Sequence, residues 1–194
     1  IRNREALSSL TDALCSSVGS LTNPNRISNV LRNVQATKID PDTISKYMDC
    51  LKDAFLFEEA RRYNIKGNKY FENIKKYYAI DVGLRNAKLN FRQQEPTHIM
   101  ENVIYNELRI RGYLVDVGVV ESREMRNGKS ELIHYEIDFI ASNGMEKYYI
   151  QSAYALDNEP KKQQELNALQ RIDDSFRKIV IIGNDIAEYT DTKG

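Results

Sequence analysis

Carboxylate and amide side chains occur at alternate positions of two neighbouring strands predicted in the second half of the chain. Glu136 and Asp138 alternate with apolar residues in the predicted strand 131–140, and Gln151 lies in the next predicted strand, 146–155. Alternate residues of a strand point to the same face of a sheet. We therefore expect Asp138 and Gln151 to meet across the turn between the two strands. The opposite face of the first strand is apolar and carries Ile133, Tyr135, Ile137 and Phe139.

A helix predicted over 97–111 offers a third oxygen ligand for the same place. Glu101 and Glu107 both lie in this helix, and its residues alone do not distinguish them. Carboxylate and amide oxygens are the ligands that Mg²⁺ binds in proteins. Mg²⁺ is therefore the cofactor that this set of side chains suggests.

The sequence does not contain a complete phosphate-binding loop for ATP. Gly128-Lys129-Ser130 matches the end of such a loop, but Arg123 stands where the loop needs another glycine. The segment also joins two predicted strands, whereas a phosphate-binding loop opens a helix so that backbone amides face the phosphates. We therefore expect no ATP site in these residues.

Cations gather in the first half of the chain. Residues 1–94 hold 16 lysines and arginines against 10 acids, a balance of +6, and residues 95–194 hold 12 against 18, a balance of −6. Such asymmetry favours contact between the first half and a polyanion such as duplex DNA. The candidate nucleic-acid contacts are Thr43, Ser45 and Lys46 on a predicted helix and Lys66 and Lys69 at a predicted turn.

The elements of the first half follow the order of a winged helix-turn-helix. Apolar residues at helical spacing predict a helix over 2–19, and the pairs Asn23-Pro24 and Asp40-Pro41 mark the starts of two more. An extended run from Phe55 then reaches the turn Lys66-Gly67-Asn68-Lys69, which predicts a two-stranded hairpin. The third helix would enter a DNA groove and the hairpin would be the wing. The alternative is that these elements only pack together or bind protein.

The second half predicts an α/β layer with a mixed sheet. Its expected elements are a helix at 97–111, strands at 113–122, 131–140 and 146–155, a helix at 158–172 and a strand at 179–182. Asn143-Gly144 is a strong hairpin signal between two of the strands. Because Gln93-Gln94-Glu95-Pro96 resembles a linker, we expect domains at 1–94 and 95–194.

Several sequence motifs together resemble a known family, the C-terminal region of prokaryotic AAA-type ATPases. They are Thr43-Ile44-Ser45-Lys46-Tyr47, Lys76-Tyr77-Tyr78-Ala79-Ile80-Asp81-Val82-Gly83-Leu84-Arg85-Asn86, Glu101-Asn102-Val103-Ile104-Tyr105-Asn106-Glu107-Leu108, Glu136-Ile137-Asp138-Phe139 and Tyr149-Ile150-Gln151. The resemblance covers residues 25–182, and its most specific part is the string that begins at Lys76. It implies a winged helix followed by a PD-(D/E)XK restriction-endonuclease-like domain of unknown function, with the ATPase domain upstream.

The resemblance also assigns roles, and the sequence departs from them at one motif. Glu101 would be the helix acid, Asp138 the strand acid, and the acid-x-Lys motif would fall on Gln151-Ser152-Ala153. Glu101 and Asp138 would be weak metal ligands, but Ala153 supplies no ammonium group. Loss of one such electrostatic group typically costs about 100-fold or more in rate. The resemblance therefore implies a degenerate catalytic site rather than an active enzyme.

Two other functions stay open at this point. A lysine elsewhere, such as Lys147 or Lys161, could replace the missing one in a Mg²⁺-dependent DNA endonuclease. The chain could also be an interaction or oligomerisation module that binds the upstream ATPase domain, a partner protein or a second copy of itself. ATP would enter only through that upstream domain.

Composition indicates a folded protein without a membrane partner. Hydrophobic residues make up 41% and charged residues 29% of the chain, and no run approaches the roughly 18 apolar residues of a membrane span. Two cysteines are too few for a disulfide framework. We therefore expect a cytoplasmic location and, since the chain opens at Ile1, a piece of a longer protein.

Overall fold

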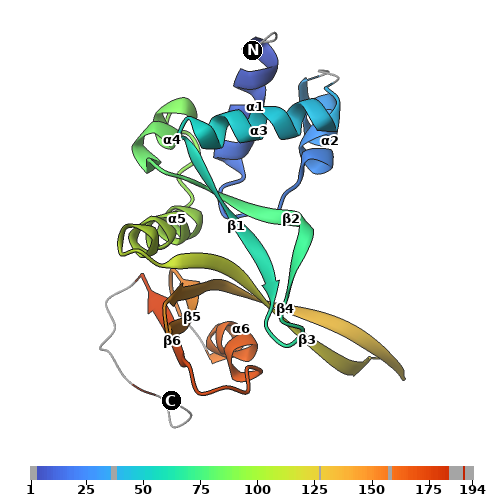
Figure 1. The fold of residues 1–194 in the computed structure, drawn as a ribbon, viewed down its shortest axis with the longest axis vertical. Coiled ribbons are helices and arrows are strands. Elements are labelled where there is room, and N and C mark those ends of the chain that lie inside the picture. Colours follow the sequence, from blue (N-terminus) through green and yellow to red (C-terminus); the bar gives the residue numbers. More distant parts are fainter. Residues whose placement is uncertain (1–3, 36–38, 127, 157–158, 184–189, 191–194) are drawn as a thin grey trace. The chain divides into compact units, whose positions relative to one another are not determined.

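The computed structural model describes residues 4–35, 39–126, 128–156, 159–183 and 190. The described residues form a mixed α/β structure with six helices and a six-stranded sheet (Figure 1). The chain divides into two compact units. Unit 1 comprises Ile1–Ala60 and Asn73–Val103, and unit 2 comprises Arg61–Glu72 and Ile104–Gly194.

Unit 1 contains three helices around an apolar core. These are α1 (Arg4–Ser16), α2 (Pro24–Gln35) and α3 (Pro41–Asp53). The helices bury Leu10, Leu14, Leu31, Ile44 and Met48. The start signals explain where α2 and α3 begin, since each has proline at its first position, and the Asn23 side chain accepts a hydrogen bond from the Arg26 amide.

A single residue between α1 and α2 pairs with the hairpin. Thr22 forms an isolated antiparallel bridge with Lys75 of β2 (Lys69–Ala79), with N···O distances of 2.8 and 3.0 Å. Gly19 N donates to Tyr77 O in the same way. The segment that joins the first two helices is therefore fixed along the outer edge of β2.

The hairpin of β1 (Phe57–Asn64) and β2 contributes residues to both units, because its tip, 61–72, belongs to unit 2. It is followed by α4 (Val82–Lys88), which Asp81 caps by accepting a hydrogen bond from Leu84 N, and by α5 (Pro96–Ile110). The predicted domain boundary after residue 94 stays a prediction. The two units divide the chain differently, since residues 61–72 belong to unit 2 and residues 95–103 belong to unit 1.

Unit 2 holds the strands of the second half. They are β3 (Leu114–Arg126), β4 (Lys129–Asn143), β5 (Glu146–Ala153) and β6 (Arg177–Ile182), with α6 (Glu159–Gln170) between the last two. The strand order of the sheet is β2-β1-β3-β4-β5-β6. β1 pairs with β3 and β5 pairs with β6 in parallel, whereas the β3–β4 and β4–β5 pairs are antiparallel. The predicted mixed sheet is confirmed.

A β-bulge interrupts β4 at Asp138. Between the pairs Asp116↔Ile140 and Gly118↔Ile137, β3 has one residue and β4 has two, Asp138 and Phe139. Ile137 and Ile140 consequently share one core cluster with Leu169 of α6. The prediction that Ile137 and Phe139 share a face is therefore wrong: Phe139 lies outside that cluster, with its ring centroid 6.3 Å from that of Tyr105 on α5.

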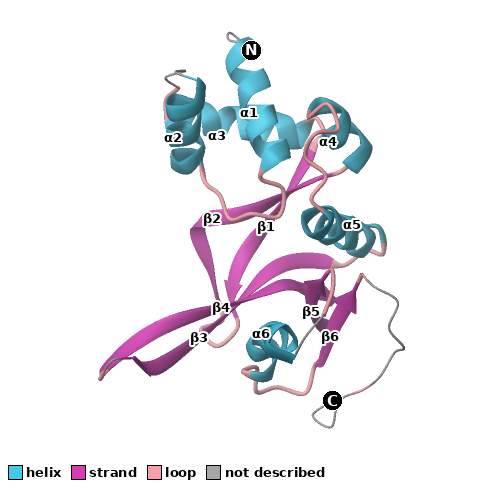
Figure 2. Cartoon of the chain, turned by 180° about the vertical axis from the view of Figure 1, so that it is seen from behind, coloured by secondary structure: helices cyan, strands magenta, loops and turns pink. Residues whose placement is uncertain are grey.

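The strands β3 and β4 extend further than the sequence predicted. The last β1–β3 pair is at Val119, and the β4–β5 pairs begin at Phe139. The pairs from Glu121↔His134 to Arg126↔Lys129 continue beyond them as a two-stranded ribbon, which projects past the other strands of unit 2 (Figure 2). We call residues 121–126 and 129–134 the β-arm.

No helix among the described residues is both long and apolar enough to cross a membrane. This agrees with the absence of a long apolar run in the sequence.

Within unit 1, two lysines hold one carboxylate between α3 and the hairpin. Lys52 Nζ and Lys75 Nζ lie 2.9 and 2.7 Å from the carboxylate oxygens of Glu59, and Lys52 also lies 3.0 Å from Asp49. Burial alone would raise the pKa of Glu59, but the hydrogen bonds and charges of the two lysines outweigh it and hold the pKa below its ordinary value.

We predict that Glu59→Gln lowers the free energy of unfolding at pH 7 by about 1–3 kcal/mol, the usual worth of hydrogen bonds to a charged group. Because the folded-state pKa is lowered, the carboxylate stabilises the fold above its unfolded-state pKa of about 4.3, and this contribution is lost as the pH falls through the folded-state value. Urea unfolding at pH 7 and near pH 3 should therefore show a difference that shrinks with acid. Glu72→Gln, at an exposed position of β2, is the control. Equal stability of Glu59→Gln and the parent at pH 7 would contradict this account.

Candidate functional site

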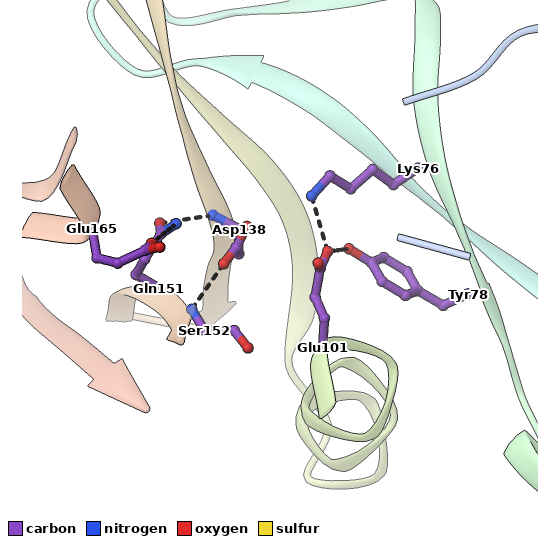
Figure 3. Close-up of polar contacts among 7 residues, drawn as sticks. All are labelled: Lys76, Tyr78, Glu101, Asp138, Gln151, Ser152 and Glu165. Carbon is purple, nitrogen blue, oxygen red and sulfur yellow. Dashed lines mark hydrogen bonds and ion pairs between the residues drawn. The ribbon is translucent and has the colours of Figure 1, made fainter. Parts of the chain in front are cut away.

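The structure brings Asp138 and Gln151 together within unit 2. Asp138 is 8% exposed, and its Oδ2 accepts a hydrogen bond from Ser152 N at 2.8 Å (Figure 3). Asp138 N in turn lies 3.4 Å from Gln151 Oε1. The β4–β5 turn thus places these two predicted site residues side by side on adjacent strands.

Glu165 is a third member of this group that sequence analysis missed. Its Oε2 accepts a hydrogen bond from Gln151 Nε2 at 3.1 Å, so the amide lies between two carboxyl-bearing residues (Figure 3). A signal for Glu165 was present in the sequence. It precedes Leu169 by four positions and Ile172 by seven, and such residues share one face of a helix. Leu169 and Ile172 are buried in the unit 2 core.

Glu101 lies in unit 1, where it is 7% exposed. Its Oε1 is 2.9 Å from Lys76 Nζ and accepts a hydrogen bond from Tyr78 OH at 2.7 Å (Figure 3). A Cβ atom at Gly19, which has φ +73°, would lie 3.2 Å from the same carboxylate. This close approach favours glycine there. Because Asp138 and Gln151 belong to the other unit, convergence of all three residues stays a prediction.

The two alternatives for a third oxygen ligand differ in their surroundings. Glu107 is exposed and pairs at 2.7 Å with Arg111, the residue that follows the end of α5. Glu101 is buried against an ammonium and a phenol group. A buried carboxylate needs such a partner to stay charged. Lys76 and Tyr78 therefore explain the burial of Glu101 without a metal ion.

The lysines proposed to replace the missing one differ in what the structure describes. Lys147 Nζ lies 4.7 Å above the ring of Phe176, a cation–π geometry at the start of β5. The side chain of Lys161 lies outside the described residues. Ala153, where the sequence resemblance would place the motif lysine, is buried.

The donor set in unit 2 fits Mg²⁺ poorly. It consists of Asp138, the neutral amide of Gln151 and the Glu165 carboxylate that this amide binds. In the part of the chain that the structure describes, no group of three or more His, Cys, Asp or Glu side chains is arranged to hold a metal ion. The predicted role of Glu101 and Asp138 as weak metal ligands stays a prediction.

The predicted nucleic-acid contacts lie at the surface of their units. On α3 in unit 1, Lys46 is exposed and Thr43 and Ser45 are half-buried. Lys66 and Lys69 are exposed at the tip of the β1–β2 hairpin, in unit 2.

Two further arginines accompany the hairpin lysines, and sequence analysis missed them. The guanidinium carbon of Arg61 lies 3.9 Å from the ring centroid of Tyr70, and that of Arg62 lies 5.0 Å from that of Phe71. The Arg61-Arg62 dipeptide just before a predicted turn was the available signal. The hairpin tip therefore presents cations on aromatic rings, a combination common in nucleic-acid-binding proteins.

The buried pair of Lys76 and Glu101 predicts a large effect on stability. Lys76→Met should lower the free energy of unfolding by about 3–5 kcal/mol, because it leaves a buried carboxylate without its ammonium partner. Adding Glu101→Gln should restore part of the loss, which a double-mutant cycle by urea unfolding measures. Lys66→Met, at an exposed position, is the control. Strictly additive effects of the two substitutions would contradict a direct pair.

Comparison with known proteins gives similarity without a function. Residues 1–95 match the family model described as "Domain of unknown function (DUF8612)". An uncharacterized protein of Haemophilus influenzae (strain ATCC 51907 / DSM 11121 / KW20 / Rd) is 36% identical over 183 residues, which cover 94% of this chain and 42% of that protein. No solved structure matches. The chain is thus similar to about two fifths of the longer Haemophilus protein.

Proposed function

We propose that this chain is a nucleic-acid-binding region of a longer protein, with a winged helix followed by a nuclease-like domain whose catalytic set is incomplete. The observation that carries the proposal is the bridge between Thr22 and Lys75. It places one residue paired to β2 between α1 and α2, ahead of the helices α2 and α3 and the strands β1 and β2. A winged helix has its first, short strand at this place in the order of elements.

In this proposal α3 is the helix that enters a DNA groove. Its apolar residues Ile44, Met48 and Leu51 are buried, which leaves Lys46 on the opposite, solvent-facing side. Ser45 and Thr43 can donate and accept hydrogen bonds, and Lys46 can bind phosphate. The helix therefore has one face for the core and one for a ligand.

The hairpin tip supports the same proposal within unit 2. Residues 61–72 contain four cations, Arg61, Arg62, Lys66 and Lys69, and one acid, Glu72. An excess of three positive charges over twelve residues favours phosphate contact that does not depend on base sequence.

The remaining elements of unit 2 support the nuclease-like part of the proposal. Asp138 lies at a bulge in β4, and bulges often re-aim side chains near functional sites. Gln151 and Ala153 replace the acid and the lysine that the resembled family uses. With a neutral amide and a methyl group at these places, the unit lacks charges that would activate water and oppose charge on a scissile phosphate.

We propose further that the longer protein is an AAA-type ATPase and that this region is its accessory C-terminal part. The length of the Haemophilus relative leaves room in that protein for another domain. ATP binding and hydrolysis would belong to such a domain, which would also be the first partner of this region.

A Mg²⁺-dependent DNA endonuclease is the second candidate, and one contact favours it. Glu165 places a carboxylate 3.1 Å from the Gln151 amide, beside the position of the missing acid. If the Glu165 carboxylate left the Gln151 amide and bound a metal ion, Asp138 and Glu165 would supply two charged ligands. The missing lysine remains an obstacle to this candidate.

The binding proposal predicts salt-dependent affinity for duplex DNA. The whole chain should bind DNA with an affinity that falls as salt rises, because lysines release counterions from phosphates. Lys46→Gln, Lys66→Gln and Lys69→Gln should each weaken binding about equally for different sequences and lower the salt slope by about 1. Fluorescence anisotropy measures both quantities, with Arg177→Gln at an exposed position of β6 as the control. Failure of the unmodified chain to bind DNA at low salt would overturn the proposal.

The incomplete catalytic set predicts no strand cleavage. The unmodified chain should leave supercoiled plasmid intact in Mg²⁺ or Mn²⁺, and Asp138→Asn should change nothing. Gln151→Glu combined with Ala153→Lys is the restoring variant, checked for folding by circular dichroism because Ala153 is buried. Nicking by the unmodified chain that Asp138→Asn abolishes would establish the endonuclease instead, and Glu165→Gln would then test the second carboxylate.

A further inference from the structure

Unit 1 contains an apolar cavity of about 230 Å³. Its walls come from α1, from the segment between α3 and β1, from the end of β2 and from α4. Of the lining residues, Cys15, Phe57 and Ala79 are buried, and Thr11 is half-buried on α1. A dry apolar cavity of about 150 Å³ can hold a benzene molecule. The cavity in unit 1 therefore has room for one aromatic side chain.

Large apolar side chains stand exposed around this cavity. Phe55 is 77% exposed, Leu84 is 60% exposed and Leu56 is 39% exposed, and all three line the cavity. Single exposed apolar residues are common on protein surfaces, whereas a group of them around a hollow marks a contact site. We call the cavity and these three side chains the apolar pocket.

Phe55 has a backbone conformation that its own unit does not favour. It follows the end of α3 with φ +56°. Leu56 N donates to Leu51 O at 3.0 Å. Phe55 N donates to Lys52 O at 2.9 Å, and the two bonds together form a Schellman motif. Glycine is usual at this position because a Cβ atom is strained at positive φ. A strained and exposed phenylalanine does little for the stability of unit 1, but it is available to a partner.

The charged residues around the apolar pocket are balanced in sign and engaged within unit 1. Lys88 lies 3.0 Å from Asp12, and Asp81 caps α4. Arg85 is buried, and its hydrogen bonds go to uncharged groups. Unit 1 as a whole has 12 lysines and arginines against 11 acids, a balance of +1. Two copies of this surface can therefore approach without strong repulsion, and the charges favour no polyanion or polycation there.

We propose that the apolar pocket binds a second copy of this chain, with Phe55 of each copy inserted into the cavity of the other. In a two-fold dimer the same patch lies on both sides of the interface, so the patch must be complementary to itself. A protruding ring beside a cavity of matching size meets this requirement in shape, and the balanced charges meet it electrostatically. The inference goes beyond the proposed nucleic-acid-binding function and does not depend on it.

The test measures dimerisation of the whole chain by sedimentation equilibrium at about 1 μM to 1 mM. Phe55→Gly removes the protruding ring, and Thr11→Phe fills the cavity from α1. Each substitution should weaken dimerisation about tenfold or more, because buried aromatic anchors carry much of the energy of an interface. An equimolar mixture of the two variants should associate more strongly than either alone. In the mixture, Phe55 of the Thr11→Phe chain still fits the open cavity of the Phe55→Gly chain.

Matched variants control for the loss and the gain of an exposed ring. Phe91 is 61% exposed at φ +55° and is not among the residues that line the pocket, so Phe91→Gly removes a similar ring elsewhere. Asn29→Phe adds a ring at an exposed position of α2. Both controls should dimerise like the unmodified chain.

Folding of the variants is checked separately. The melting temperature of Phe55→Gly as a monomer should equal or exceed that of the unmodified chain, because glycine relieves the strain at positive φ. A ring that served only to stabilise unit 1 would give a lower melting temperature instead. If circular dichroism shows that Thr11→Phe does not fold, Thr11→Leu fills less of the cavity and replaces it in the mixture.

The outcomes separate a reciprocal contact from any other. Dimerisation that Phe55→Gly weakens and that the mixture restores supports the inference. An unmodified chain that stays monomeric up to about 1 mM overturns it and leaves the pocket to an apolar side chain of another protein. A dimer that Phe55→Gly leaves intact places the interface elsewhere and also overturns it. So does a mixture that associates no better than its components, since the two substitutions would then not act on one contact.

Discussion

One extra residue in β4 determines much of the arrangement of unit 2. Because Asp138 and Phe139 together face Val117, the strand changes its alternation at this point. Ile137 and Ile140 then both join the core cluster with α6, while Phe139 packs near Tyr105. Gly118 on the neighbouring strand β3 leaves room for Ile137 in this arrangement. A Cβ atom at position 118 would lie only 2.8 Å from the Cβ atom of Ile137. The bulge also places Asp138 so that its carboxylate meets Ser152 N and its amide approaches Gln151.

Local signals in the sequence were sufficient for most of the elements and insufficient for the bulge. Asp40-Pro41 marks the start of α3 and Asn143-Gly144 marks the β4–β5 turn, because capping and turn chemistry act over a few residues. A bulge depends on how two strands pair. The alternation of apolar and polar residues along one strand gives no sign of it. Sequence analysis also missed the length of the β-arm. Its residue pairs depend on the partner strand, and its exposed residues interrupt the alternation of apolar and polar residues that predicts a strand.

Contacts between segments that lie far apart in the chain account for the other features that sequence analysis missed. The parallel pairing of Arg62 to Asn64 with β3 places the hairpin tip in the sheet of unit 2, although fifty-odd residues of chain separate the partners. Composition changes near Pro96 reflect the local linker and carry no information about that pairing. Similarly, Glu165 becomes a neighbour of Gln151 only when α6 packs on the sheet. By contrast, Asp138 and Gln151 follow from one short turn and were within reach of sequence analysis.

In the proposed function, the residues that would weaken catalysis at a nuclease-like site would also favour binding of nucleic acid. A carboxylate at position 151 would add a negative charge beside Asp138 and Glu165, and without a metal ion such charges repel a phosphate backbone. Gln151 removes one of these charges and keeps its hydrogen-bonding groups, which bind Asp138 N and Glu165. Lys76 offsets the charge of Glu101 in unit 1 in a comparable way, by a direct ion pair. In the proposed function, the acids of the nuclease-like core are therefore engaged within their own units, and the exposed cations of α3 and the hairpin tip are the groups that meet the polyanion.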